Sequence, residues 1–410
     1  MYRVEAVPAA ANGEIAVGRA TLAGLCANLV GIGLARFAYA PLIPALIAAH
    51  WLLPAQAVYL GAANLAGYLA GALLAHRMAV RVPVAVVLRV MMLLATAAFF
   101  ACALPLSFLW LSLWRFAAGV AGGALMVLAA TTVLSHVSPS RRGIVGGIVF
   151  TGVGLGIAAS GLLVPLLLRL GLAATWCGLG LLSLALTLVA WGGWLTDRSI
   201  VAVARAKSAP ARPPSRRALK ALYAEYALNA VGLVPHMVFL VDFVARGLGR
   251  GIASGAQDWV IYGIGAILGP VLAGRLADAI GFGTALRLAY VVQAIAVAAL
   301  AATTGTAVLI VSSFVVGAFT PGIVPLVLGR VHELADASDH KIGWSIATTA
   351  FALGQAAAAY GCAALFAATG DYGLLFMLGS AALLLALAID LVAARREPSA
   401  VAGPEDGLRL

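Results

Sequence analysis

The sequence predicts an all-α membrane protein in which twelve transmembrane helices form two pseudo-symmetric six-helix bundles. Hydrophobic residues make up 63% of the 410 residues and charged residues only 10%. In a soluble domain only about half of the residues are apolar. The mean hydropathy of this chain is correspondingly high, at +1.05. Twelve apolar stretches are each long enough, at about 20 residues, to cross a bilayer as a helix. One long polar segment, 196–218, separates the first six stretches from the last six.

The twelve expected spans are bounded by charged residues, proline or glycine. In the first bundle, 18–195, they are 18–47, 55–77, 82–104, 107–134, 143–168 and 172–195. In the second bundle, 219–394, they are 219–245, 255–279, 283–303, 306–329, 342–368 and 372–394. Tails 1–17 and 395–410 flank them. Segment 196–218 carries six basic residues and three prolines, which predicts a flexible linker between the bundles.

Basic residues in the loops indicate how the chain is oriented. The loops on the side of the linker carry Arg77, Arg81, Arg141, Arg142, Arg275, Arg287, Arg330 and Lys341. The loops on the opposite side carry only Arg169, Arg246 and Arg250. Because loops rich in Lys and Arg stay in the cytoplasm, we expect the linker and both termini there. The expected location is a bacterial cytoplasmic (inner) membrane, crossed many times.

The two halves of the sequence resemble each other at matching positions. Residues 28–31 (NLVG) in the first span resemble 229–232 (NAVG) in the seventh. Residues 69–71 (LAG) likewise resemble 272–274 (LAG). Two six-span halves with weak internal similarity are typical of transporters whose substrate site lies near the midplane, between the halves.

Arginines without acidic partners distinguish the first half. Between Ile15 and Thr196 the chain has nine arginines and no aspartate or glutamate. Arg36 and Arg115 lie inside long apolar stretches, where a charge is costly unless it faces water or a partner. At 1.5 Å per residue, both lie roughly 5–8 Å to the same side of the midplane. An intramembrane arginine is by default a functional-site hypothesis.

Several motifs resemble the major facilitator superfamily, and more narrowly its YbfB/YjiJ-type branch. The superfamily motifs are 269–281 (GPVLAGRLADAIG) and 115–119 (RFAAG). The branch motifs are 31–44 (GIGLARFAYAPLIP), 242–249 (DFVARGLG) and 319–325 (FTPGIVP). The resemblance extends through essentially all twelve spans and implies the major facilitator fold. In that fold the first and fourth spans line the cavity, so the resemblance implies that Arg36 and Arg115 face one aqueous chamber.

Two departures from the superfamily pattern affect these expectations. Ala75 occupies the position where a charge-relay aspartate is expected in the first half. The resemblance therefore implies that locking on the cytoplasmic side depends mainly on Arg275 and Asp278. In the fifth span, Ser160 and Gly161 replace the Gly-Pro pair of the exporter-type motif, which leaves import and export both open.

Two guanidinium groups suit an anionic substrate, because their planar, multi-donor geometry matches carboxylate, phosphate or sulfonate. The competing interpretation is structural. Arg36 and Arg115 would then be held by backbone carbonyls freed near Gly31, Gly33 and Pro41, or would pair with Asp242 or Asp258 as an extracellular gate.

Four residues are candidates for proton coupling or gating: Glu225, His236, Asp242 and Asp258. A carboxylate in a low-dielectric cavity favours its protonated form, and histidine titrates near neutral pH. The alternative for His236 is helix packing, and for the carboxylates it is snorkelling or pairing. Further polar residues near mid-span are candidates for substrate binding: Asn28, Tyr39, Asn64, Tyr68, Asn229, Tyr262, Thr320 and Gln355. Each could instead hold helices together.

The sequence favours a secondary transporter that moves a small, anionic organic metabolite by proton-coupled alternating access. The four cysteines are scattered singly through apolar spans, which indicates neither disulfide nor metal site. We expect no cofactor and no enzymatic activity, because no phosphate-binding loop or nucleophile constellation is present. The scattered positive charges do not indicate nucleic acid. We expect a monomer whose partners are a small solute, protons and the lipid bilayer. The alternatives are a proton-driven exporter of drugs or hydrophobic compounds, and a non-transporting membrane receptor.

Overall fold

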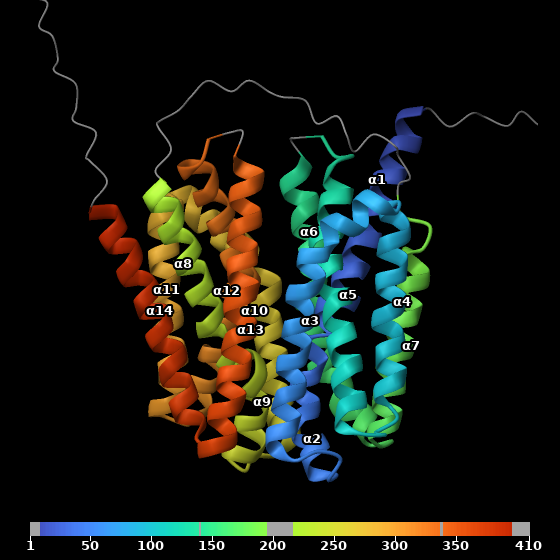
Figure 1. Cartoon of the computed structure of the whole chain (residues 1–410), viewed down its shortest axis with the longest axis vertical. Coiled ribbons are helices and arrows are strands. Elements are labelled where there is room, and N and C mark those ends of the chain that lie inside the picture. Colours follow the sequence, from blue (N-terminus) through green and yellow to red (C-terminus); the bar gives the residue numbers. More distant parts are fainter. Residues whose placement is uncertain (1–8, 139–140, 195–215, 337–338, 396–410) are drawn as a thin grey trace, which may run out of the picture.

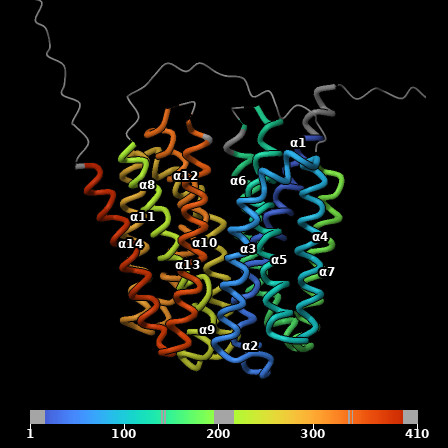
Figure 2. The backbone as a smooth tube through the Cα atoms, viewed as in Figure 1, coloured from blue at the N-terminus to red at the C-terminus, as the bar shows by residue number. Residues whose placement is uncertain are grey.

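The computed structural model describes residues 9–138, 141–194, 216–336 and 339–395. Within these residues, twelve helices are long and apolar enough to cross a membrane, which confirms the expected number of spans. Figure 1 shows them as two groups side by side, with α1–α7 in one bundle and α8–α14 in the other. The starts of α1 and α8 and the end of α14 lie on one face of the molecule, the terminal face (Figures 1 and 2).

Each bundle contains six spans, of which the first is interrupted. The first bundle consists of α1 (Ala9–Asn28), η1 (Leu29–Leu34), η2 (Phe37–Leu42), α2 (Ile43–Ala48), α3 (Pro54–Arg81), α4 (Val84–Cys102), α5 (Phe108–Leu134), α6 (Arg142–Leu168) and α7 (Leu172–Ala190). The second consists of α8 (Arg216–Val234), η4 (Pro235–Phe239), α9 (Leu240–Asp242), η5 (Phe243–Gly247), α10 (Gly251–Ile280), α11 (Phe282–Ala302), α12 (Thr306–Leu334), α13 (His340–Thr369) and α14 (Tyr372–Arg395).

Helix ends follow local sequence signals. Pro54 begins α3, and the side chain of Gln56 accepts a hydrogen bond from the Leu53 amide at 3.0 Å. Ser107 caps α5 by accepting from the Trp110 amide at 3.0 Å. Gly370 ends α13 with φ of +66°, a left-handed conformation that costs a residue without a β-carbon little.

The helices extend into two segments that the sequence assigned to polar regions. Helix α1 begins at Ala9, inside the expected tail 1–17, and α8 begins at Arg216, inside the expected linker 196–218. Tail residues 1–8, linker residues 196–215 and residues 396–410 of the second tail lie outside the described residues.

The first and seventh spans, which resemble each other in sequence, are both irregular where they approach each other. In the first span a π-helical segment, η1, leads through a turn into the 3-10 helix η2, which contains Pro41. In the seventh, Pro235 opens the π-helical segment η4. A proline lacks the amide hydrogen that continues an α-helix, and π-helical turns occur frequently at functional sites. The interruptions place irregular backbone in the middle of the protein.

Glycines allow the closest helix pairs to approach within each bundle. A β-carbon at Gly119 of α5 would collide with the backbone of Asn64 in α3. The matching pair in the second bundle is α10 with α12, where a β-carbon at Gly317 would collide with the backbone of Tyr262. Such small-residue contacts are the usual means of helix association in membranes.

The bundles contact each other mainly through α6 with α10 and α3 with α13. A β-carbon at Gly154 of α6 would lie 2.6 Å from the Ile267 amide nitrogen of α10. Nearer the end of α6, Trp259 Nε1 of α10 donates to Ser160 Oγ at 3.2 Å. Helices α2 and α9 also meet, at the face opposite the terminal face (Figure 1). These contacts occupy the middle of the protein and the half that ends at the opposite face.

Candidate functional site

Arg36 lies in the turn between η1 and η2 and is partly exposed. Its Nη2 donates to the sulfur of Met237, across the boundary between the bundles, at 3.7 Å. Its guanidinium carbon lies 5.0 Å from the ring centre of Phe37 and 4.9 Å from that of Tyr68. Nε of Arg36 is buried without a hydrogen-bond partner among the described residues. A weak acceptor and two aromatic faces therefore surround this cation.

Arg115 lies on α5, is only 2% exposed, and points toward the same part of the first span. Its Nη1 donates to the carbonyl oxygen of Ala35 at 2.7 Å. Its guanidinium carbon lies 4.4 Å from the ring centre of Tyr39, within the range of a cation–π interaction. Nε of Arg115 is also buried and has no partner within the described part of the chain.

Both guanidinium groups line one cavity of about 20 Å³ between the bundles, room for about one water molecule. The cavity is lined by Arg36, Phe37, Tyr39, Ala40, Ile43, Gly61, Asn64, Leu65 and Arg115 from the first bundle and by Met237 and Val238 from the second. Across residues 9–138, 141–194, 216–336 and 339–395, neither arginine forms an ion pair. A buried charge is costly unless it is paired, and the described part of the chain supplies no such partner for these two cations.

Four sequence candidates thus meet at this cavity: Arg36, Arg115, Tyr39 and Asn64. Asn64 Nδ2 donates to the backbone oxygen of Arg115 at 3.0 Å, which fixes the helix turn that carries the arginine. The hydroxyl of Tyr39 donates to the carbonyl of Ala57 at 2.6 Å. Tyr68 joins the site through its ring, against Arg36.

In the second bundle, Gln355 of α13 approaches the site from the other side. Its Nε2 donates to the sulfur of Met237 at 3.3 Å, and its Oε1 is buried without a partner among the described residues. Tyr262 and Thr320 form a separate pair between α10 and α12. Thr320 Oγ1 donates to the Val316 carbonyl, so the Tyr262 hydroxyl donates to Thr320.

Asn28 and Asn229 occupy equivalent places in the two halves, inside their own bundles. Asn28 Nδ2 donates to the Val149 carbonyl of α6 at 3.0 Å. Asn229 Nδ2 donates to Gln293 Oε1 of α11 at 3.2 Å. Both asparagines are fully buried and neither lines the cavity. Their contacts favour the helix-packing role for these two candidates.

His236 is fully buried next to Met237, and its hydrogen bonds determine which nitrogen carries the hydrogen. Ser312 Oγ donates its single hydrogen to the Ala296 carbonyl at 2.6 Å. The contact of 2.8 Å between His236 Nε2 and Ser312 Oγ therefore has the histidine as donor. Nδ1 is buried and unpaired within the described residues. This arrangement favours helix packing over proton relay for His236.

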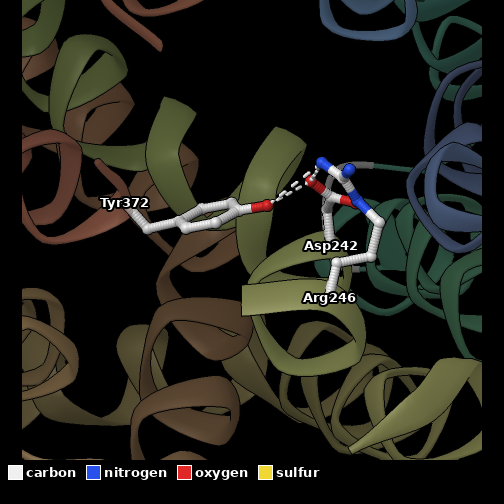
Figure 3. A network of polar contacts seen from close by, with 3 residues as sticks. All are labelled: Asp242, Arg246 and Tyr372. Atoms are coloured by element: carbon white, nitrogen blue, oxygen red, sulfur yellow. Dashed lines mark hydrogen bonds and ion pairs between the residues drawn. The ribbon is translucent and has the colours of Figure 1, made fainter. Parts of the chain in front are cut away.

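Asp242 lies at the centre of the network drawn in Figure 3. Its carboxylate is fully buried and accepts from Arg246 Nε at 2.6 Å and from Arg246 Nη2 at 2.8 Å. The hydroxyl of Tyr372, at the start of α14, donates to the same carboxylate at 2.6 Å. Asp242 is therefore paired within its own bundle, on α9 and η5 near the opposite face, and does not pair with Arg36 or Arg115.

A depression on the opposite face lies beside this network and has a volume of about 540 Å³. Leu53, Pro54 and Ala55 line it from the first bundle, and Arg246, Gly247, Phe366, Ala367, Gly370 and Tyr372 from the second. Its two walls therefore belong to different bundles.

The remaining acidic candidates lie away from the cavity. Glu225 of α8 is 2% exposed, and its Oε2 has no partner among the described residues. It lines a small cavity of about 10 Å³ with Arg330 and Asp390, toward the terminal face. Asp258 is buried on α10.

The two residues expected to lock the cytoplasmic side lie near the end of α10. Arg275 and Asp278 are both exposed on the part of α10 that approaches the terminal face. Neither forms an ion pair with a residue that the structure describes. The structure therefore shows them apart from the contacts between bundles.

Sequence reasoning missed three residues that the structure brings into these sites: Met237, Tyr372 and Asp390. Met237 has only a weakly polar thioether, and the hydroxyl of Tyr372 gives no indication from sequence of which group it contacts. Asp390 carried a usable signal, because an acid inside the last apolar stretch needs a partner. It forms an ion pair with Arg287 of α11.

Comparison with known proteins identifies the family that this chain resembles. The family model described as "Uncharacterised MFS-type transporter YbfB" matches residues 28–391. The fold is similar to the structure described as "Inward open conformation of the xylose transporter XylE from E. coli", with a TM-score of 0.70. That match has 13% sequence identity and covers 91% of this chain and 95% of XylE. A search of curated proteins finds no match.

Proposed function

This chain belongs to the YbfB family of MFS-type transporters, and from that premise we propose that it carries a small organic anion by proton-coupled alternating access. As a transporter it is a multi-pass membrane protein with twelve spans and a small-molecule substrate, and it is not an enzyme. The proposal concerns the substrate class, the coupling and the residues responsible.

One observation carries the proposal: Arg36 and Arg115 line the same cavity without a carboxylate partner among the described residues. Each has a buried Nε that lacks a hydrogen-bond acceptor there. A carboxylate, phosphate or sulfonate supplies several strong acceptors in one group. The apolar side chains of Phe37, Ile43 and Leu65 suit an organic body attached to that group.

Alternating access requires that the bundles separate at one face while they meet at the other. The described contacts between the bundles occupy the half that ends at the opposite face. These contacts support a conformation in which the terminal face is the open one. Because the basic loops lie on the terminal face, we propose that this face meets the cytoplasm of a bacterium. The protein is then a monomer in the inner membrane.

For gating, we assign the terminal-face lock to Arg275 and Asp278, and we propose that the Asp242–Arg246–Tyr372 network supports the second bundle's wall at the opposite face. The hydrogen bonds of this network lie within the second bundle, so they hold the wall in shape while other contacts join the bundles. Arg275 and Asp278 are exposed and unpaired within the described residues, as expected of an open end.

For proton coupling, Glu225 is the best supported candidate. It lies on the seventh span, is almost fully buried and retains an unpaired carboxylate oxygen among the described residues. A carboxylate oxygen without a partner is free to take up a proton and to release it again. Asp242, in contrast, is neutralised by Arg246.

A transport assay on purified protein in liposomes tests the anion proposal. We expect uptake of at least one labelled anion from a set of benzoate, succinate and glycerol phosphate. Arg36→Gln and Arg115→Gln should each reduce it at least tenfold, since a hydrogen bond to a charged group contributes about 1.5–3 kcal/mol. Arg169→Gln, in an exposed loop, should transport normally. Undiminished flux in both cavity variants, or no flux of any anion, would reject the proposal.

The second candidate is a drug exporter, favoured by the glycines at 147 and 156 of the fifth span. In the structure, a β-carbon at Gly156 would collide with Gly33 of η1, so close packing alone accounts for that glycine. Overexpression should raise tolerance to hydrophobic or cationic drugs only if the chain exports them. A non-transporting receptor would bind the anion without any flux.

A further inference from the structure

The sulfur of Met237 occupies an unusual position between hydrogen-bond donors from both bundles. It accepts from Arg36 Nη2 of the first bundle at 3.7 Å and from Gln355 Nε2 of the second at 3.3 Å. Met237 is 5% exposed and lies in the π-helical segment η4, where it lines the cavity with Arg36 and Arg115. No other acceptor for these two donor atoms is present among the described residues.

The donors at this sulfur are much stronger than the acceptor. A guanidinium and an amide are full hydrogen-bond donors, whereas a thioether is a weak acceptor. Arg36 Nε and Gln355 Oε1 are also buried without partners in the described part of the chain. An anionic oxygen would form charge-assisted hydrogen bonds here, roughly twice as strong as neutral ones.

We propose that the Met237 sulfur holds the place of the substrate's anionic group. On binding, one carboxylate or phosphate displaces the thioether and accepts from Arg36 and Gln355 together. This inference rests on the proposed anion transport and names the two side chains that bind one head group from opposite bundles. Met237 becomes a residue that sets affinity by competing with the substrate.

The geometry permits a single head group to bridge the two donors. Because Arg36 Nη2 and Gln355 Nε2 lie 3.7 Å and 3.3 Å from the same sulfur, they are at most 7.0 Å apart. A carboxylate whose two oxygens each accept a hydrogen bond of ~2.9 Å spans such a gap. A small anionic group is therefore sufficient, and the organic body needs no second charge.

The exchange also links occupancy to the contact between the bundles. Among the described residues, the hydrogen bond to the thioether is the only one that joins Arg36 to the seventh span. In the occupied site, the substrate joins Arg36 to α13 by two stronger bonds. Binding thus replaces a weak connection between the bundles with a strong one, which gives the substrate differential affinity for conformations that keep both donors close.

Two substitutions of similar volume vary the acceptor at this position. Met237→Leu removes it, and Met237→Gln replaces it with a stronger amide oxygen. Benzoate, succinate and inorganic phosphate are titrated calorimetrically into the purified full-length protein. Relative to wild type, we expect Kd for the bound anion about threefold lower with leucine and about fivefold higher with glutamine, in line with ~1 kcal/mol per hydrogen bond. Met92→Leu, a buried methionine of α4 away from the cavity, is the matched control.

The inference is supported if Kd rises from Met237→Leu to wild type and from wild type to Met237→Gln. Weaker binding in Met237→Leu, or equal Kd values in all three proteins, overturns it. Arg36→Gln is titrated in parallel. If it abolishes anion binding while the Met237 series is flat, the anion site stands and only the role of Met237 fails. If Arg36→Gln binds as wild type does, the proposed function itself fails. Melting temperatures without ligand identify any variant that is misfolded, and for such a variant Met237→Ile replaces Met237→Leu.

Discussion

Arg115 donates a hydrogen bond from Nη1 to the carbonyl oxygen of Ala35, at 2.7 Å. Ala35 directly precedes Arg36 in the turn between η1 and η2. In a continuous α-helix that carbonyl would accept from the amide of Tyr39. The fourth span therefore holds the backbone beside the other cavity arginine, and the two guanidinium groups are positioned as one unit.

The first prediction concerns the shape of the Arg115 side chain. Arg115→Lys preserves the charge but lacks the planar fork that, under the proposed function, binds the Ala35 carbonyl and an anion simultaneously. We expect anion affinity to fall about tenfold, between wild type and Arg115→Gln, as measured by calorimetric titration. Arg169→Lys, on an exposed loop, serves as the control. Wild-type affinity in Arg115→Lys would mean that charge alone accounts for the role of Arg115.

The second prediction ranks three variants of the Asp242 network by melting temperature. Arg246→Gln should be the most destabilising, because it leaves a fully buried carboxylate without its cation. Asp242→Asn should cost less, about 2 kcal/mol, because the side chain of Arg246 is 29% exposed and can turn toward water. Tyr372→Phe should cost about 1 kcal/mol for one lost hydrogen bond. A different order would contradict the burial argument.

The third prediction tests whether glycines of α6 allow the bundles to close at the opposite face. Gly154→Ala places a β-carbon 2.6 Å from the Ile267 nitrogen, so the closed arrangement should lose population to a more open one. Spin labels at Leu53 and Ala367, on opposite walls of the depression, should show longer distances by pulsed electron resonance. The four native cysteines are first replaced by serine.

The control for that experiment lies on the same helix. A β-carbon at Gly147 meets nothing within 4 Å, so Gly147→Ala should leave the label distances unchanged. Equal distances in the Gly154 and Gly147 variants would show that close approach at Gly154 does not limit closure.

The fourth prediction concerns proton coupling at Glu225. Glu225→Gln mimics the protonated carboxyl group and cannot release a proton. Uptake driven by a pH gradient should fall to the level seen without a gradient, while exchange of labelled for unlabelled anion should continue. Glu333→Gln, an exposed carboxylate on α12, should keep normal coupling. Gradient-driven uptake in Glu225→Gln would exclude Glu225 as the proton carrier.

Much of the fold could be predicted from the sequence because each span signals itself by length and hydropathy. The meeting of Arg36 and Arg115 was also within reach, since their positions along two spans give the same depth. The pairing of Asp242 with Arg246 follows the i,i+4 spacing of neighbours on a helix, although the sequence alone left Asp242 free for other partners.

Other contacts depend on how helices far apart in the sequence pack against each other. Met237 meets Arg36 across 201 positions of sequence, and Tyr372 meets Asp242 across 130. Neither a methionine nor a tyrosine in an apolar stretch indicates which polar group it will contact. The helical starts at Ala9 and Arg216 were missed for another reason, because polar and basic residues there do not signal a span.

The contacts that join the bundles toward the opposite face include no ion pair among the described residues. They consist of close helix packing at glycines, aromatic contacts such as that of Tyr59 with Tyr360, and the hydrogen bond from Trp259 to Ser160. Asp242 and Arg246 form their ion pair within one bundle. Opening this face therefore separates no opposite charges in a medium of low dielectric constant, where Coulomb attraction is strongest. The conformational change that opens this face should therefore proceed at a rate that ionic strength hardly alters.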